Sequence, residues 1–219
     1  MGNTWRITND IIPAWRTIYR IVNQAAPQTS FAGPGRWPDL DMLYVGNRVF
    51  TIPEEQTHFT LWSILKSPLM IGAALKDTKT SINSDSLAIL KNARVLSYNQ
   101  DSLGVSASLS RRYTQEGLDV WAGPLSNGRT VVALVNWNGQ ARNAQINFPD
   151  FGVQSAASLY DVWAQVSKSN VKTSYAASIA AHGTVLLELG GTSPAGTYAA
   201  SLFASSSGLV HTYMRLCTN

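Results

Sequence analysis

The sequence predicts an α/β region followed by an all-β region. In the first part of the chain, short apolar runs alternate with segments of helical periodicity, which is typical of βα units. In the second part, strand-like runs are separated by turns that contain glycine, as in a small antiparallel β-sandwich. The end of the chain is rich in Ser, Ala, Gly and Thr. The predicted units are residues 1–101 (α/β), 102–190 (antiparallel β) and 191–219 (linker and tail).

Three strands and a helix are predicted first in the α/β part. Residues 4–8 are predicted as a strand, and a helix with Pro13 in its first turn follows Asp10. Residues 37–45 form the second predicted strand. Residues 69–72 are continuously apolar, as expected of a strand that is buried on both faces.

Two further helices are predicted in the α/β part. Thr51 and Glu54 match a capping box, in which a hydroxyl and a carboxylate bind each other's free backbone N–H groups. The helix that they open carries Phe59 and Trp62 on one apolar stripe. A short helix is predicted to begin at Ser84.

The strands of the β part follow from β-branched and apolar runs between turn signals. Strands are predicted around Trp121 and over residues 131–135, 145–148 and 184–187. Turns are predicted at residues 126–128, 137–139 and 181–183.

Composition excludes several classes of protein. Of the 219 residues, 14% are charged and 45% are hydrophobic, which excludes a disordered chain. The net charge is +4, but the basic residues are scattered, so no nucleic-acid partner is predicted. The most apolar stretch, residues 59–75, is interrupted by Lys66 and Pro68, so no membrane span is expected.

Neither a metal nor another cofactor is predicted. The single cysteine, Cys217, cannot form an internal disulfide or a cysteine-based metal site, and no His, Asp and Glu cluster has metal-ligand spacing. Residues 1–5 have neither the charged nor the apolar region of a signal peptide, so none is expected there. Taken alone, these observations indicate a cytosolic or truncated protein.

Two segments resemble landmarks of glycoside hydrolase family 27, the α-galactosidases. Residues 5–11, WRITNDI, followed by Trp15, resemble the sixth-strand signature of that family. Residues 33–43, GPGRWPDLDML, resemble its G-P-G-x-W-x-D-x-D-M-L motif. The likeness continues through residues 55–62, 67–69 and 98–104 and covers about residues 3–190.

This resemblance implies a fold and a chemistry. The α/β part would be the C-terminal part of a (β/α)8 TIM barrel, and retaining hydrolysis of α-galactosides by two carboxylates would be the reaction. Asp10 matches the general acid/base of the family, and Arg6 matches an arginine that hydrogen-bonds sugar hydroxyls. Asp41 and Met42 match residues that line the galactose pocket. A carbohydrate substrate and secretion are implied as well.

The residues themselves are compatible with these roles but allow others. Asp10 follows a predicted strand, at the end where barrel active sites are built, and Arg6 lies on the same face of that strand. The alternative for Asp10 is an N-cap of the following helix. The alternative for Arg6 is an ion pair with Asp10 or Asp39.

Three neighbouring residues are given structural roles. We expect Asp39 to accept a hydrogen bond at a strand end, and Trp37 to form a packed wall rather than a platform for a sugar. His58 lies among aromatic residues of a predicted helix, and we expect a hydrogen-bonded core histidine there.

The sequence also departs from the family. The nucleophile of the family lies in a K-x-D-x-C motif, which does not occur in this sequence. We therefore expect a fragment that does not hydrolyse glycosides alone, because no glycosyl-enzyme intermediate can form without a nucleophile. The strand before Asp10 should have an unpaired edge, which favours aggregation.

Three alternatives to an α-galactosidase stay open, and so does the oligomeric state. Two keep the fold and change the sugar: α-N-acetylgalactosaminidase and β-L-arabinopyranosidase. The third is a non-catalytic piece that binds glycans or is purely structural.

Overall fold

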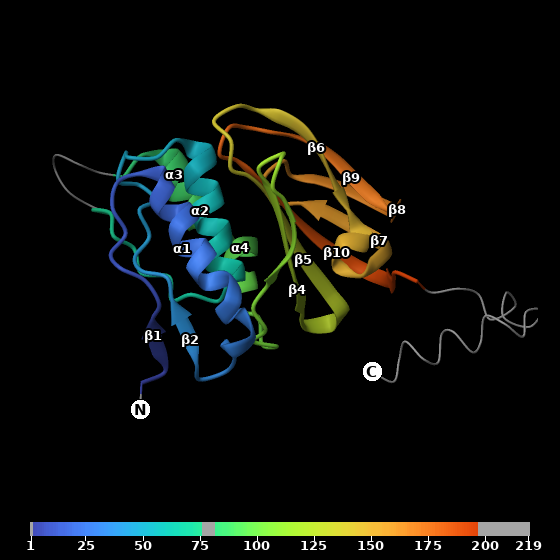
Figure 1. The fold of residues 1–219 in the computed structure, drawn as a ribbon, viewed down its shortest axis with the longest axis horizontal. Helices are drawn as coiled ribbons and strands as arrows, with labels where there is room; N and C mark the ends of the chain where they lie inside the picture. The colour runs from blue at the N-terminus through green and yellow to red at the C-terminus, as the bar shows by residue number, and fades with distance from the viewer. Residues whose placement is uncertain (1, 76–81, 197–219) are drawn as a thin grey trace, which may run out of the picture.

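The computed structural model of the protein describes residues 2–75 and 82–196. Its α-helices lie on one side of the molecule and its antiparallel sheets on the other (Figure 1). The first half contains, in chain order, β1 (Thr4–Arg6), α1 (Trp15–Ala25), the 3-10 helix η1 (Ala26–Phe31), β2 (Trp37–Asp39), α2 (Ile52–Ile64), α3 (Ser84–Leu90) and α4 (Ala93–Asn99). The second half contains β3 (Ser108–Tyr113), β4 (Leu118–Leu125), η2 (Ser126–Gly128), β5 (Arg129–Asn136), β6 (Arg142–Asn147), η3 (Phe148–Phe151), β7 (Val153–Asp161), β8 (Val166–Lys172), β9 (Ser174–Ile179) and β10 (Thr184–Pro194).

The strands of the first half run parallel. β1 pairs with β2 over three residues, and an isolated parallel bridge joins Leu43 to Ile71. Parallel neighbours need a crossover connection, and here α1 lies between β1 and β2 in the chain. This arrangement confirms the predicted α/β region. Within the described residues β1 has no second neighbour, so its predicted open edge is confirmed there.

Two predicted strands are shorter than expected. The strand predicted over residues 37–45 ends at Asp39, because Asp41 adopts a left-handed backbone with φ of 79° that interrupts an extended chain. The strand predicted over residues 69–72 is reduced to the bridge at Ile71. Met70 and Ile71 are 41% and 40% exposed, so burial on both faces was wrong.

The first helix begins later than predicted. α1 starts at Trp15, after the extended residue Ala14, so Pro13 lies outside it. The preceding segment is held as a loop because the backbone N–H of Ile11 donates to the carboxylate of Asp41 at 2.7 Å. The helix packs on the core through Ile18, which is fully buried.

The capping box of α2 is confirmed. The Thr51 hydroxyl accepts from the Glu54 N–H, and the Glu54 carboxylate accepts from the Thr51 N–H at 2.8 Å. Nearly every side chain of α2 is buried, whereas the sequence indicated one apolar stripe. The predicted α3 is confirmed, but α4, which follows after a two-residue break, was not predicted.

The second half confirms the predicted antiparallel β-sandwich. One sheet has the strand order β3-β4-β5-β10-β7-β8, with antiparallel neighbours throughout, and β6 pairs with β9 in a second sheet. An apolar core that includes Val120, Leu134 and Phe148 lies between them. The strands predicted at β4, β5, β6 and β10 are correct, and β3, β7, β8 and β9 were missed.

The helical layer is fixed to the larger sheet by apolar and polar contacts. Trp62 of α2 and Trp121 of β4 belong to one continuous buried cluster. The Trp163 indole donates to the Thr60 hydroxyl at 3.0 Å, which joins the loop after β7 to α2. These contacts hold α2 in one position behind the loops that follow β1 and β2.

The predicted unit boundaries at residues 101 and 190 stay predictions. Cys217 and most of the predicted tail lie outside the described residues. Among the residues that the structure describes, no helix has the length and apolar character needed to cross a membrane.

Candidate active site

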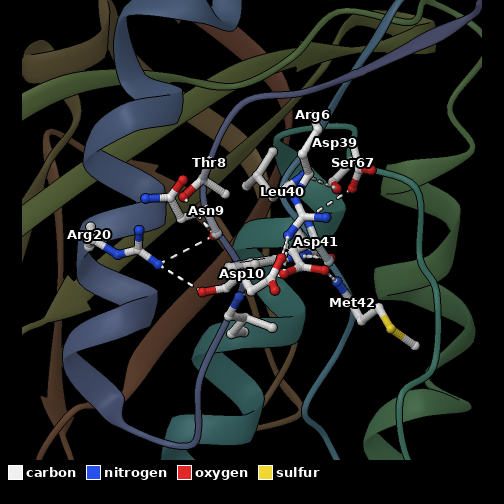
Figure 2. A network of polar contacts seen from close by, with 12 residues as sticks. Arg6, Thr8, Asn9, Asp10, Arg20, Asp39, Leu40, Asp41, Met42 and Ser67 are labelled. Atoms are coloured by element: carbon white, nitrogen blue, oxygen red, sulfur yellow. Dashed lines mark hydrogen bonds and ion pairs between the residues drawn. The ribbon is translucent and has the colours of Figure 1, made fainter.

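The predicted site residues come together at one edge of the β1–β2 pair. Arg6 is the last residue of β1, Asp10 lies in the loop after it, and Asp41 and Met42 lie in the loop after β2. Since the two strands are parallel, both loops begin at the same end of the pair, the C-terminal ends of the strands. Figure 2 shows the side chains of Arg6, Asp10 and Asp41 converging there.

Arg6 connects the two carboxylates. Its Nη2 donates to Asp10 Oδ1 at 3.0 Å and also to Asp41 Oδ2. The predicted ion pair with Asp10 is therefore confirmed. The alternative pair with Asp39 is not formed, because Asp39 Oδ1 accepts the N–H of Asp41 at 2.8 Å, as expected of an acceptor at a strand end.

Asp10 presents its carboxylate to solvent. Its side chain is 93% exposed, and among the described residues its ionic partner is Arg6. It does not cap α1, whose N-cap residue is Ala14 without a side-chain hydrogen bond, so the N-cap interpretation was wrong. Arg20 of α1 holds the backbone instead, since its Nη2 donates to the Asp10 carbonyl oxygen at 3.0 Å (Figure 2).

Asp41 has the opposite environment. Its side chain is 10% exposed, and its carboxylate accepts from the N–H groups of Ile11 and Met42 and from Arg6. A carboxylate has about four acceptor positions, so the protein itself uses three of them. One acceptor position of the Asp41 carboxylate is therefore left for a hydroxyl of a ligand.

These residues line an open cleft of about 420 Å³. Asp10 and Met42 face it with substantial exposed surface, and Met42 is 42% exposed. Tyr44 and Asn47 also line the cleft and were missed by the sequence analysis. Both residues follow Met42 closely in the chain, and this proximity could have indicated that they line the same cleft.

Trp37 lies elsewhere. It is partly buried and lines a separate cavity of about 270 Å³ with Lys66 and Asn99. This position is the opposite end of β2 from the loop that carries Asp41. The structure thus does not bring Trp37 into the cleft with Asp10.

His58 lies in the core, as expected, but it is not hydrogen-bonded. It is fully buried, and neither ring nitrogen has a partner among the described residues. Burial lowers the pKa of His58 to about 3, so the ring is neutral at ordinary pH. It stacks on Trp62, with ring centroids 4.1 Å apart.

The arrangement suits proton transfer at a bound ligand. Asp10 is a solvent-facing carboxylate next to a cation, and Asp41 is a buried carboxylate occupied by backbone and guanidinium donors. Of these two carboxylates, Asp10 is the one that is open to a molecule in the cleft. Among the described residues, no group of three or more His, Cys, Asp or Glu side chains could hold a metal ion.

Comparison with known proteins places this geometry in a family. A family model described as alpha galactosidase A matches residues 1–101, and one described as alpha galactosidase C-terminal beta sandwich domain matches residues 115–189. The chain is 61% identical over 213 residues to the probable alpha-galactosidase D of Aspergillus flavus, covering 97% of this chain and 32% of that protein. It thus spans about a third of the length of this relative.

Solved structures of similar fold are enzymes of the same family. The alpha-galactosidase I of Mortierella vinacea is 29% identical with a TM-score of 0.78, covering 87% of this chain and 54% of that chain. A family 27 β-L-arabinopyranosidase from Geobacillus stearothermophilus, solved in complex with arabinose, is 29% identical with a TM-score of 0.76, covering 86% and 45% of the two chains. Together the two family models account for most of the described structure, helical layer and sandwich alike. The chain therefore belongs to glycoside hydrolase family 27, the family of the α-galactosidases, and it contains the C-terminal β-sandwich domain of that family.

Proposed function

We propose that this chain is the C-terminal portion of a retaining α-galactosidase that releases terminal α-linked galactose from galactosides and galacto-oligosaccharides. The observation that carries the proposal is the exposed carboxylate of Asp10, which lies in an open cleft and is paired with Arg6. A general acid/base must reach both the leaving oxygen and, later, a water molecule. Asp10 meets this requirement because its side chain is almost completely exposed.

The other site residues have binding roles in this proposal. Arg6 donates to sugar hydroxyls with the guanidinium hydrogens that its two carboxylate partners leave free. Asp41 accepts one hydroxyl, and Met42 contacts the apolar face of the sugar. Carbohydrate as the partner and secretion of the whole protein belong to the proposal as well.

The second carboxylate of a retaining mechanism is expected from residues outside this sequence. Retaining enzymes hold their two carboxyl groups about 5 Å apart, and one of them attacks the anomeric carbon. Asp41 is the other carboxylate of the cleft that Arg6 binds, but its hydrogen bonds hold it in place. We therefore propose that the isolated chain binds sugar weakly and does not hydrolyse it.

The alternative activities have less support. The likeness to the β-L-arabinopyranosidase is no stronger than the likeness to the Mortierella vinacea enzyme, whereas the relative at 61% identity is called a probable alpha-galactosidase. A non-catalytic role would not require an almost completely exposed carboxylate in the cleft, such as that of Asp10.

A chimera tests the proposal. This chain would replace the matching segment of the Aspergillus flavus relative, and release of galactose from an aryl α-galactoside and from an unactivated galactoside would be measured. We expect hydrolysis by the chimera and none by the isolated chain. Asp10→Ala should slow the unactivated substrate far more than the aryl substrate, because a poor leaving group needs the proton.

Azide identifies the role of Asp10 in the same chimera. In Asp10→Ala, azide can attack the glycosyl-enzyme intermediate without base assistance, so we expect faster turnover and α-galactosyl azide as the product. The matched control is Asp85→Asn, an exposed carboxylate in the first turn of α3 outside the cleft. Equal slowing of both substrates, or a β-galactosyl azide product, would contradict the acid/base role.

A further inference from the structure

Asp41 has a backbone conformation that few residues adopt. Its φ of 79° lies in the left-handed region, where glycine is favoured and a side chain is strained. The surrounding structure must therefore hold it there. On the N-terminal side, Asp39 Oδ1 accepts the Asp41 N–H at 2.8 Å.

Trp62 holds the other side of this residue. Its indole Nε1 donates to the Asp41 carbonyl oxygen at 2.7 Å, and this contact is buried. Trp62 is fully buried in α2, and its ring stacks on His58, which is also fully buried. Since the ring is packed between α2 and the loop, the indole N–H has one fixed direction.

We propose that Trp62 is a positioning residue of the active site, which fixes the Asp41 peptide through its indole N–H. With the N–H and the carbonyl of Asp41 both held, the Asp41 carboxylate points in one direction. That carboxylate accepts hydrogen bonds from the Ile11 N–H and from Arg6, and Arg6 in turn donates to Asp10. The catalytic consequence rests on the proposed function, whereas the positioning itself does not.

Loss of the hydrogen bond between Trp62 and Asp41 would also change the positions of Arg6 and Asp10. Without the indole N–H, the buried carbonyl of Asp41 has no partner in place, and rotation of the peptide would relieve both the strain and the unpaired oxygen. Rotation would withdraw the carboxylate from Ile11 and Arg6. Asp10 would then keep its exposure but lose its orientation in the cleft.

The chain offers a matched control tryptophan. Trp121 of β4 is also fully buried, and its indole nitrogen has no hydrogen-bond partner among the described residues. Trp62→Phe and Trp121→Phe therefore remove similar ring volume from the same apolar cluster. Only Trp62→Phe also removes a hydrogen bond.

Amide hydrogen exchange in the 219-residue chain tests the positioning. We expect Trp62→Phe to speed exchange of the Ile11 and Met42 amides by about tenfold more than that of Ala107, whose N–H donates to Ile64 at the end of α2. Trp121→Phe should change the three amides by similar factors. If Trp62→Phe accelerated exchange at Ile11 and Met42 no more than at Ala107, as is expected of Trp121→Phe, the proposal would be overturned.

A second variant covers the case in which Trp62→Phe does not fold. Incorporation of 3-benzothienylalanine at position 62 keeps the bicyclic ring and replaces only the N–H by sulfur. We expect the same selective acceleration at Ile11 and Met42. Unchanged exchange of these amides in the folded analogue would also overturn the proposal.

Kinetics of the chimera test the catalytic consequence. Trp62→Phe should lower kcat about tenfold on the unactivated galactoside and less on the aryl galactoside, since the orientation of the acid is what changes. Trp121→Phe should leave the ratio of the two substrates unchanged. An inactive parent chimera would refute the proposed function, while the exchange measurement would still decide the role of Trp62.

Discussion

The β1–β2 pair and the central strands of the large sheet differ in how completely their backbones are paired. β5 pairs with β4 over eight residues and with β10 over six, whereas β1 pairs with β2 over three residues and has no other neighbour among those described. Yet the candidate site lies beside the shorter pair. Asp10 and Asp41 lie beyond this short ladder and are held by hydrogen bonds of side chains.

Asp41 illustrates this difference. Its carboxylate accepts two backbone N–H groups, and its own N–H and C=O bind the side chains of Asp39 and Trp62. These four hydrogen bonds replace the regular strand pairing that β2 loses after Asp39. In the sandwich, by contrast, the corresponding backbone groups bind each other. A site built on loops can place its side chains freely, but its stability depends on a few contacts.

The largest expected effect is a difference in hydrogen exchange between these two regions. We expect amides of Val132 and Leu134 in β5 to exchange only through global unfolding, and that of Trp37 in β2 to exchange through local opening. The opening free energies should differ by about 4 kcal/mol, which is about a thousandfold in rate. Native-state exchange followed by NMR measures both, and equal protection would refute the comparison.

The next effect concerns the ion pairs of Arg129, which belongs to the central strand β5. Arg129 of β5 binds Asp101 at 3.1 Å and Glu188 of β10 at 3.2 Å, and the Asp101 side chain is 2% exposed. Arg129→Ala should reduce the free energy of unfolding by about 3 kcal/mol, because it removes the ion-pair partner of a buried carboxylate. Urea denaturation measures this change.

Arg94→Ala is the control for this prediction. Arg94 binds the same Glu188 at 3.1 Å, but its side chain is 44% exposed. Its ion pair is therefore screened by solvent, and the loss should be about 1 kcal/mol. If the two variants were equally destabilised, burial of Asp101 would not be what makes Arg129 important.

Local signals in the sequence predicted the local structure well. The pair Thr51 and Glu54 predicted the start of α2, because a capping box involves residues three apart. The short helix predicted from Ser84 is α3, whose N-cap is Asn83. β8 and β9 were missed because they are rich in Ser, Lys, Asn and Ala, and they become strands only through pairing with β7 and β6.

The site was predicted less evenly. The resemblance indicated Arg6, Asp10, Asp41 and Met42, and all four line one cleft, although their roles stay predictions. The left-handed backbone of Asp41 and its contact with Trp62 could not be predicted. Both depend on where α2 packs behind the loop, which no local pattern records.

His58 links stability to pH in the layer between the two regions. Its pKa is about 3 in the folded protein and about 6.5 in the unfolded chain, so below pH 6.5 only the unfolded chain takes up this proton. Its contribution to stability is complete above pH 6.5 and is lost as the pH falls toward 3. Wild type should lose about 1.4 kcal/mol per pH unit more than His58→Phe between pH 6 and 4.5.

Urea denaturation at several pH values measures this difference. At pH 7, His58→Phe should be at least as stable as wild type, because an apolar ring replaces two buried nitrogens without partners. Parallel stability curves for the two proteins would show that His58 becomes protonated in the folded state, and hence that this layer is accessible to water.

The smallest expected effect is at the start of α2. Thr51→Ala removes the hydroxyl that accepts from the Glu54 N–H, and should lower the free energy of unfolding by about 1 kcal/mol. Thr51→Ser keeps the hydroxyl and should retain the stability of wild type. Because Glu54 also binds His182 of the sandwich at 2.7 Å, the loss is expected to reach both regions together in one thermal transition. Two separate transitions in Thr51→Ala would mean that α2 is not the element that joins the site to the sheet.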